Sequence, residues 1–144
     1  MPFLTGLISF YLVFWGISSF AFRQELATSS AKAAMAAGCM FIMIGIAHFI
    51  KRDMFEGIMK GMTKHARLLN FASGAFEVIL GVGLFFTATR LISSIGLILL
   101  LIAVFPANFN HARISPSRKN VIRLYFQPVY ILWMWWASGW YWPF

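Results

Sequence analysis

A carboxylate in the middle of an apolar segment is the feature of this chain that most invites a chemical explanation. Glu77 stands inside "NFASGAFEVILGVGLFF", the segment from Asn70 to Phe86. A charged side chain that faces lipid at the centre of a bilayer costs at least about 2.5 to 3.5 kcal/mol, so Glu77 is expected to face other helices, to be protonated, or both. Helical spacing supports the first expectation, because small and polar residues share one face: Asn70, Ser73, Gly74, Glu77 and Gly81.

Polar side chains in the other apolar segments fall at a similar depth and are expected to meet Glu77. Buried polar groups need hydrogen-bond partners, and the bilayer supplies no water for them. We therefore predict a pocket that opens toward the cytoplasm, near Pro106 and Pro128, whose missing backbone donors free carbonyl groups. The predicted ligand-binding residues are His48, Ser73, Glu77, Asn108 and Gln127, with Arg123 and His111 as possible charge partners.

Each of these side chains also has a purely structural interpretation, which the sequence leaves open. Asn108 and Gln127 are amides, and amides ordinarily join membrane helices by hydrogen bonds. His48 near the bilayer edge is equally suited to an interfacial position. Glu77 would be structural if it formed an ion pair with Arg123 or His48, although an intramembrane carboxylate is functional by default.

No self-contained catalytic or metal-binding constellation is visible in the sequence. It shows no nucleophile with a base and an orienting partner, no metal-ligand spacing and no Gly-rich nucleotide loop. The single cysteine, Cys39, excludes an intrachain disulfide and a CxxC motif. His48 and His111 do not make a haem site. The chain is therefore not expected to be an enzyme by itself, and any redox role would use a quinone or a partner's cofactor.

The composition indicates an all-α polytopic membrane protein. Its 144 residues are 60% hydrophobic and 11% charged, with a mean hydropathy of +0.76, whereas soluble domains carry about 25% charged residues. Segments of about 20 apolar residues are long enough to cross a bilayer. We predict a single membrane domain, residues 1–144, with five transmembrane helices: Phe3 to Phe22, Ala33 to Ile50, Leu68 to Thr87, Leu91 to Phe109 and Leu124 to Trp142.

The loop between the second and third of these segments, residues 51–67, has an amphipathic pattern. Its large apolar residues recur at helical spacing, and Lys60 and Lys64 lie on the other side. This pattern predicts a short interfacial helix with its lysines toward lipid phosphates, and a lid over a lateral opening is one function it could have. The apolar residues are Met54, Phe55, Ile58, Met59 and Met62.

The distribution of positive charge predicts the orientation. Nine of the 12 Lys and Arg fall in the loops on the side of the N-terminus and three fall on the other side. Because cytoplasmic loops collect positive charge, we place the N-terminus in the cytoplasm and the C-terminus outside, in a cell (inner) membrane. The net charge of +8 then reflects topology and contact with anionic lipid, and no nucleic-acid partner is expected. An aromatic belt at the outer interface would contain Trp133, Trp135, Trp136, Trp140 and Trp142.

Four motifs resemble the DoxX-like family of integral membrane proteins. "GIAHF", "SGAFEVILGVGLF", "FPANF" and "RLYFQPVYILWMWW" occur in the order and at the spacings typical of that family, from about Gly38 to Trp142. The resemblance implies an up-and-down four-helix bundle over residues 33–142, to which the helix at residues 1–22 is an addition. It also implies a polar cluster and, in some relatives, quinone-coupled sulfur oxidation or oxidative-stress complexes; others resemble assembly chaperones for receptor channels. The implied cluster consists of His48, Glu77, Asn108 and Gln127.

Three function classes follow from these observations. In the first, the pocket binds a lipophilic small molecule, a quinone or a lipid head group, and supports a partner's redox chemistry. In the second, the bundle is an accessory subunit or assembly factor for another membrane protein, or a homo-oligomer, and the polar cluster only specifies packing. In the third it is a small proton-coupled transporter, although one carboxylate and no visible inverted repeat are thin support for alternating access.

The charge distribution generates a first prediction. A fluorescent protein that matures only in the cytoplasm should be bright when fused to the N-terminus and dark when fused after Phe144, because nine of 12 basic residues lie on the N-terminal side. A periplasmic alkaline phosphatase reporter should give the opposite pattern. Fluorescence from the C-terminal fusion would show that the orientation is wrong.

Overall fold

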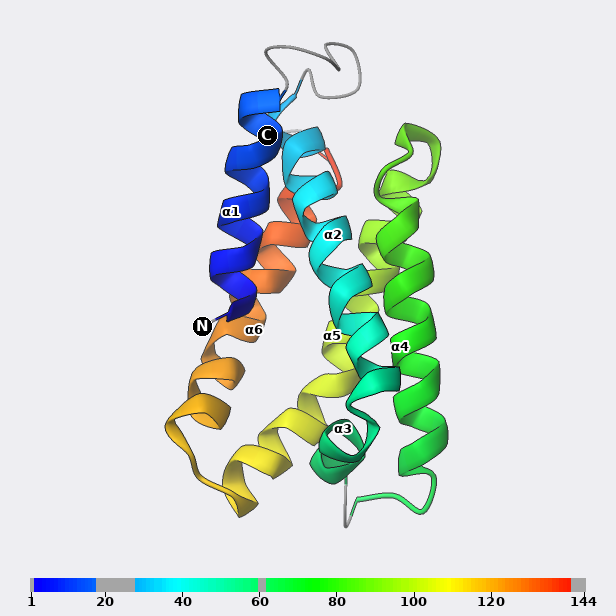
Figure 1. Ribbon diagram of the computed structural model, residues 1–144, viewed down its shortest axis with the longest axis vertical. Helices are drawn as coiled ribbons and strands as arrows, with labels where there is room; N and C mark the ends of the chain where they lie inside the picture. The colour runs from blue at the N-terminus through cyan, green and yellow to red at the C-terminus, as the bar shows by residue number, and fades with distance from the viewer. Residues whose placement is uncertain (1, 18–27, 60–61, 141–144) are drawn as a thin grey trace.

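The computed structural model describes residues 2–17, 28–59 and 62–140, and all regular structure in these ranges is helical. Five longer helices run alternately up and down, and the short helix α3 crosses one end of the bundle (Figure 1). The helices are α1 (Pro2–Ile17), α2 (Ser29–Ile50), α3 (Arg52–Met59), α4 (Ala66–Gly83), α5 (Thr87–Ile114) and α6 (Arg118–Ala137).

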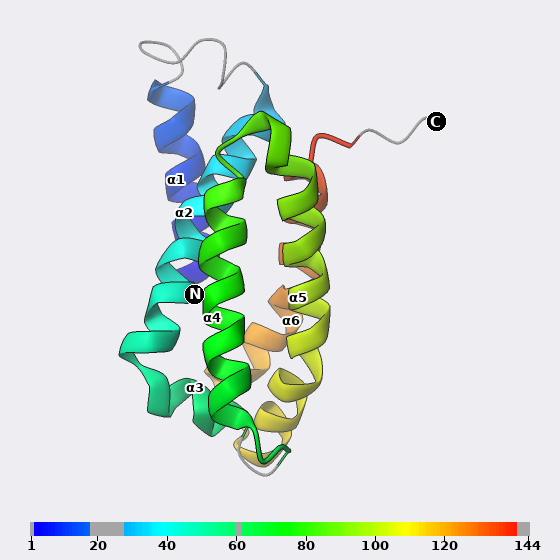
Figure 2. The same cartoon turned by 90° about the vertical axis from the view of Figure 1, so that its right-hand side faces the viewer.

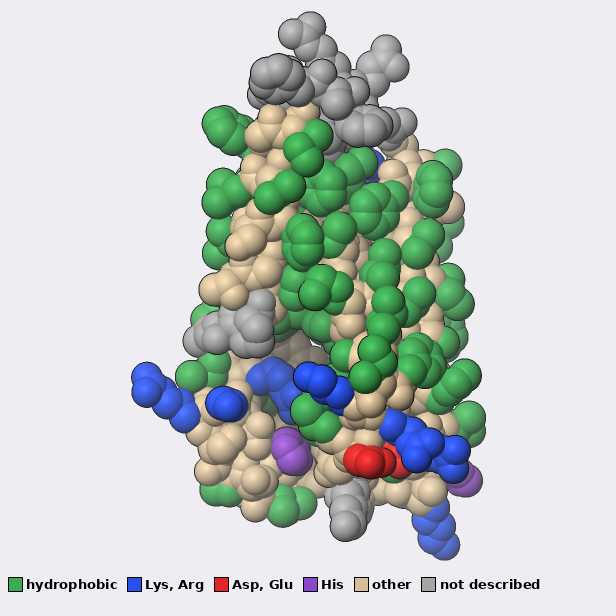
Figure 3. Space-filling view, viewed as in Figure 1, with side chains coloured by type: hydrophobic (Ala, Val, Ile, Leu, Met, Phe, Trp, Pro, Cys, Tyr) green, Lys and Arg blue, Asp and Glu red, His purple; other side chains and the backbone are tan. Residues whose placement is uncertain are grey.

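Among the described residues, α2, α4 and α5 are long and apolar enough to cross a membrane. Many large apolar side chains of α4 and α5 point away from the bundle, and the flanks of the molecule are accordingly apolar over most of their height (Figure 3). Such surfaces suit contact with lipid. The helix α1 contributes a shorter apolar stretch, Phe3–Ile17, and the basic and polar first turn of α6 lowers the hydropathy of that helix.

The helix ends differ from the predicted segments because polar caps extend the helices beyond their apolar parts. The helix α2 begins four residues before Ala33, where the Thr28 side chain accepts a hydrogen bond from the Ala31 N–H. The helix α6 begins six residues before Leu124, where Ser117 caps the Asn120 N–H. It ends at Ala137, so the prediction that this helix continues is wrong for residues 138–140. Residues 141–144, which include Trp142, lie outside the described ranges. Residues 18–22 of the first predicted segment also lie outside them.

Glycines let α2 and α4 approach closely along their length. A Cβ atom at Gly45 would lie 2.7 Å from the Gly74 carbonyl oxygen, and one at Gly38 would lie 2.8 Å from the Gly81 carbonyl oxygen. The two pairs are seven residues apart on each helix, so they stack on one seam of the antiparallel pair. In a membrane this close backbone packing replaces the hydrophobic driving force between helices.

The half of the bundle that contains the start of α2 is the upper half in Figure 1. It is held together by small residues of α2 and by aromatic rings of α1 and α6. Four buried alanines of α2 form the centre of the core. The Trp133 indole N–H donates to the Ala33 carbonyl at 3.1 Å, and the Tyr11 ring packs against Trp133 at a centroid distance of 6.0 Å. This half is therefore tightly filled. The alanines are Ala33, Ala34, Ala36 and Ala37.

The lower half is more open because α5 bends there. Below Pro106, α5 turns away from α4 toward the start of α6 (Figures 1 and 2), as expected where a proline removes a helical hydrogen bond. The helix α3 lies across this end. The bend and α3 together position the polar residues described below.

The close packing of α2 on α4 generates a second prediction. Gly45→Ala should lower the free energy of unfolding by about 1 to 3 kcal/mol, because the methyl group would overlap α4 backbone atoms. Gly16→Ala is the matched control, since no atom lies within 4 Å of a Cβ there and alanine favours a helix by about 1 kcal/mol. Thermal unfolding in mild detergent, followed by circular dichroism, measures both. Equal melting temperatures for the two variants would contradict the close packing.

Candidate functional site

A cavity of about 350 Å³ lies in the lower half of the bundle and receives residues from all six helices. Its apolar wall includes Phe3, Phe41 and Leu101. The five side chains predicted to bind a ligand all line it, together with Arg123; His111 is not among the lining residues. The polar lining residues are His48, Ser73, Glu77, Asn108, Arg123 and Gln127.

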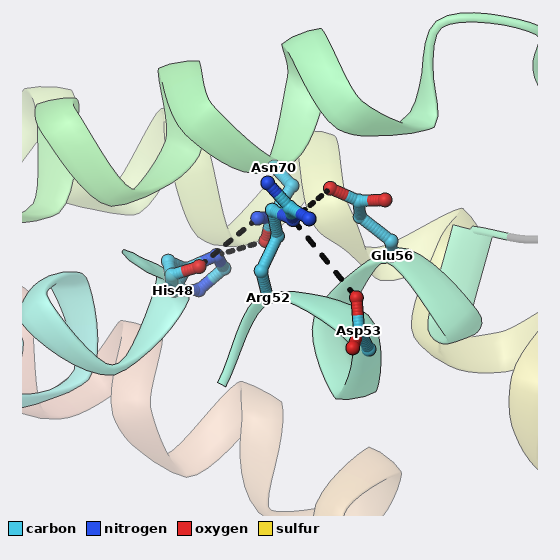
Figure 4. Close-up of polar contacts among 5 residues, drawn as sticks. All are labelled: His48, Arg52, Asp53, Glu56 and Asn70. Atoms are coloured by element: carbon cyan, nitrogen blue, oxygen red, sulfur yellow. Dashed lines mark hydrogen bonds and ion pairs between the residues drawn. The ribbon is translucent and has the colours of Figure 1, made fainter. Parts of the chain in front are cut away.

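His48 is the centre of the polar contacts on one side of this cavity. Its Nδ1 lies 2.7 Å from Asn70 Oδ1, and the Asn70 amide N–H donates to the His48 carbonyl at 3.1 Å (Figure 4). That carbonyl belongs to the last turn of α2, where a helix supplies no donor. On the opposite side of the ring, His48 Nε2 lies 3.5 Å from Glu77 Oε2. All three residues are at most 9% exposed.

The Asn70 amide determines which nitrogen of His48 carries a proton. Its nitrogen must face the His48 carbonyl, so its oxygen faces Nδ1 and accepts a hydrogen bond from it. Nδ1 is therefore protonated, and a neutral ring presents the lone pair of Nε2 to Glu77. The contact between His48 Nε2 and Glu77 is attractive only when the two side chains share one further proton. That proton is either on Glu77, as a carboxylic acid beside a neutral imidazole, or on His48, as an imidazolium beside a carboxylate.

Glu77 retains capacity for another partner. Its Oε2 is buried and makes no hydrogen bond within the described part of the chain, because the contact with His48 lies at the outer limit of hydrogen-bond distance. The sequence left open an ion pair with Arg123 or with His48, and the structure places His48 beside the carboxylate. Among the described residues no ion pair joins Glu77 to Arg123 or His111, although Arg123 lines the same cavity.

The amides of α5 and α6 form a second polar pair across the cavity. Asn108 donates to Gln127 Oε1 at 3.2 Å, and Gln127 donates to the Leu101 carbonyl. This carbonyl is adjacent to that of Ile102, whose helical donor would be the N–H that Pro106 lacks. Gln127 therefore bonds a carbonyl next to the one that the proline leaves without a helical donor. Both amides remain at the cavity wall.

The helix α3 covers the cavity from below with four of the five apolar residues that the sequence pattern grouped; Met62 lies beyond the end of the helix and is not among the lining residues. The Phe55 ring stacks on the His48 ring at a centroid distance of 3.8 Å. On its polar side, Arg52 Nε lies 3.4 Å from Glu56 and 3.9 Å from Asp53 (Figure 4). Lys60 lies outside the described residues, and Lys64 follows the helix rather than lying on it. The lining residues from α3 are Met54, Phe55, Ile58 and Met59.

Two contributors to the site were missed by sequence reasoning. The sequence placed Asn70 on the same helix face as Glu77, seven residues away, but did not assign it as the partner of His48. Its position on that face was the signal that could have indicated this contact. Phe3 reaches the cavity from α1 and packs on the Tyr130 ring at a centroid distance of 4.3 Å. No pattern in the sequence indicated that contact, since it joins the two ends of the chain.

The groups at this site are of types that can recognise a ligand and exchange a proton. Amide and guanidinium donors, carbonyl and carboxylate acceptors and an imidazole surround one part of the cavity, and rings and aliphatic chains form the rest. Among the described residues, no three His, Cys, Asp or Glu side chains are grouped so that they could hold a metal ion.

Comparison with known proteins gives the family of the chain. Residues 35–138 match the model of the family described as Domain of unknown function (DUF8561), so the chain belongs to that family. The match covers α2 from residue 35 onward and all of α3 to α6, and it includes the polar residues that line the cavity. No curated protein and no solved structure matches the chain.

The Asn70 contact generates a third prediction. In protein labelled with ¹⁵N histidine, the neutral His48 ring should carry its proton on Nδ1, because Asn70 accepts from that nitrogen. Asn70→Leu should shift the ring toward the Nε2–H tautomer and destabilise the fold by about 1 to 3 kcal/mol, since the His48 carbonyl loses its donor.

The exposed His65 is the internal reference for this measurement, because its ring nitrogens have no hydrogen bond within the described residues. Its ¹⁵N shifts should be the same in both proteins. An Nε2–H tautomer of His48 in the unmodified protein would contradict the geometry.

Proposed function

We propose that this protein binds a lipophilic small molecule with a polar end, a quinone or a lipid head group, in the cavity beside His48 and Glu77. The observation that carries the proposal is the composition of that cavity. Its volume of about 350 Å³ lies within the range of roughly 300 to 1,000 Å³ typical of ligand pockets. A wall that is mostly apolar, with a few convergent polar groups, is the usual arrangement of such pockets.

The polar groups suit a ligand with carbonyl or hydroxyl oxygens. Glu77 Oε2 lacks a hydrogen bond in the described structure and is buried at the cavity, and a buried polar atom gains most from a partner. Arg123 and the Asn108 amide supply donors from the other side. The proton held between His48 and Glu77 would be available to a bound quinone that receives electrons from a partner protein. A bound hydroquinone would pass electrons to the partner and return a proton to the pair.

The proposal includes five membrane spans. Support comes from packing, because α1 and α6 lie alongside helices that are long enough to cross a membrane (Figure 1). Phe3 of α1 packs on Phe41 of α2, and Trp133 of α6 donates to the Ala33 carbonyl of α2. Helices in such contact with α2 would occupy the same hydrocarbon layer. The N-terminus would be cytoplasmic, as the charge distribution favours, and the membrane would be the cell (inner) membrane.

The motif resemblance also supports a wider relationship, to the DoxX-like bundles, which we include in the proposal. The order of the motifs around His48, Glu77, Asn108 and Gln127 is its basis. An accessory subunit or assembly factor is the alternative function, in which the same polar contacts would only fix the packing of the bundle. A small proton-coupled transporter would use the His48 and Glu77 pair as its proton carrier.

The fourth prediction tests the ligand. Ile44→Phe should fill part of the cavity, and Met43→Phe is the control because Met43 is the next residue of α2 and is 56% exposed on its outer side. After purification in mild detergent, Ile44→Phe should retain about tenfold less of a short-chain ubiquinone probe than the unmodified protein does. Met43→Phe should retain as much as the unmodified protein, because only Ile44→Phe removes pocket volume. Extraction and mass spectrometry measure the retained quinone and native lipids.

Glu77→Gln separates the function classes. It keeps the shape and part of the hydrogen bonding of the side chain, so a ligand site should lose retention while the melting temperature changes little. If the cluster is only packing, the melting temperature should change and retention should not. Equal retention by Ile44→Phe, Glu77→Gln and the unmodified protein, with the same partner protein co-purified by all three, would overturn the binding proposal in favour of the accessory function.

A further inference from the structure

A second, basic cavity of about 580 Å³ lies on the other side of the His48 and Asn70 pair. It is formed where the end of α2, the start of α3 and the first turn of α4 meet. His48 and Asn70 both line it, and His48 also lines the central cavity. The remaining lining residues are Phe49, Arg52, Lys64, His65, Arg67, Leu68 and Phe71.

The polar part of this basic cavity is strongly positive. Arg52, Lys64 and Arg67 line it, and no acidic side chain does. Arg52 is partly neutralised by Asp53 and Glu56. Within the described ranges, no carboxylate lies at ion-pair distance from Lys64 or Arg67. Two cationic groups therefore line a concave surface without a counter-ion among the described residues.

The start of α4 adds to the positive electrostatic potential of the basic cavity. The helix begins at Ala66, and its N-cap residue, His65, provides no side-chain hydrogen bond to the first turn. The free N–H groups of a helix N-terminus and the helix dipole both favour an anion. These N–H groups lie next to the cationic side chains of Lys64 and Arg67, so both contributions act at the same place.

The other part of the basic cavity is apolar and continuous with the outer surface of the bundle. Leu68 is 65% exposed and Phe71 is 60% exposed, and the Phe49 ring contacts the Phe71 ring at a centroid distance of 5.2 Å. These side chains lie on α2 and α4, helices that can cross a membrane. The cavity thus joins an anion-binding region to a surface that suits acyl chains.

The position along the bundle is that of a membrane interface. Lys and Arg side chains form a band near the end where α3 lies, and the surface above the band is largely apolar (Figure 3). Among the described residues, Lys32 and Arg90 are the only Lys and Arg at the opposite end of the bundle. A phospholipid whose acyl chains pack along α2 and α4 would place its phosphate at the level of this band.

We propose that the basic cavity binds the headgroup of an anionic phospholipid from the leaflet at the α3 end, with its phosphate held by Arg52, Lys64 and Arg67 and its acyl chains on Phe49, Leu68 and Phe71. A soluble phosphate compound would use the basic side chains but not the apolar ones. The inference rests on insertion of the bundle in a membrane, and it is independent of the ligand proposed for the central cavity.

The experiment is a lipid titration of delipidated protein in neutral detergent, followed by native mass spectrometry. The probes are dioleoyl phosphatidylglycerol, which is anionic, and dioleoyl phosphatidylcholine, which has no net charge. The test variant is Lys64→Gln with Arg67→Gln. The matched control is Arg113→Gln with Arg118→Gln, which removes the same charge from exposed residues at the same end of the bundle. Lys64→Gln alone, outside the helices, is a second test variant with little effect on folding.

The unmodified protein should bind phosphatidylglycerol about tenfold more tightly than phosphatidylcholine, the test variant should lose most of this preference, and the control should keep it within about twofold. Equal losses in the test and control variants would overturn the proposal, since they would indicate only general attraction to charge. Displacement of the lipid by millimolar glycerol 3-phosphate would overturn the lipid assignment in favour of a soluble phosphate. Ile44→Phe, which alters only the central cavity, should still bind phosphatidylglycerol. Failure of the ligand proposed for the central cavity can therefore be told apart from failure of the lipid proposal.

Discussion

The contact between Gly45 and Gly74 is the constraint on which the rest of the lower bundle depends. A Cβ atom at Gly74 would lie 2.6 Å from His48 Cβ, so the absence of a side chain there is what lets His48 lie against α4. Gly74 comes four residues after Asn70 and three residues before Glu77, and these three positions share one helix face. His48 therefore reaches Asn70 with one ring nitrogen and Glu77 with the other. Any wider separation of α2 and α4 would leave buried polar groups without partners, which is costly in a membrane.

This contact also accounts for the two cavities. His48, which Asn70 holds by two hydrogen bonds, lines both an outer basic cavity and an inner mixed cavity. The two differ in electrostatics because the carboxyl group of Glu77 lines only the inner one, whereas Arg52, Lys64 and Arg67 line the outer one. A neutral molecule with hydrogen-bonding ends suits the first, and an anion suits the second. Both cavities therefore lie next to the same imidazole, that of His48.

The sequence predicted the helical class, the inward face of Glu77 and the polar set around it, because these follow from rules that act within one helix. Periodicity places Ser73 and Glu77 on one stripe, and the cost of burying them requires partners. The pairings could not be predicted in the same way. Three candidate cations were available for Glu77, and the choice of His48 depends on how closely two glycines pack. The contribution of Phe3 depends on how α1 lies against α6, which no local pattern encodes. The helix ends were misplaced by four to six residues where caps such as Thr28 and Ser117 extend a helix into polar sequence.

The helix α3 is the least firmly held wall of the central cavity. It has eight residues, fewer than an isolated helix needs for stability, and none of them is buried. Its apolar side chains line the cavity, and the Phe55 ring stacks on His48. The walls formed by α2 and α4 are fixed by backbone contact, and those formed by α5 and α6 are fixed by the Asn108 and Gln127 amides. Displacement of α3 would break the fewest contacts, so the free-energy cost of access to Glu77 is lowest on that side. The same displacement would leave the ring of His48 uncovered while its bond to Asn70 stayed intact, which keeps the imidazole oriented toward Glu77 whether the cavity is open or closed.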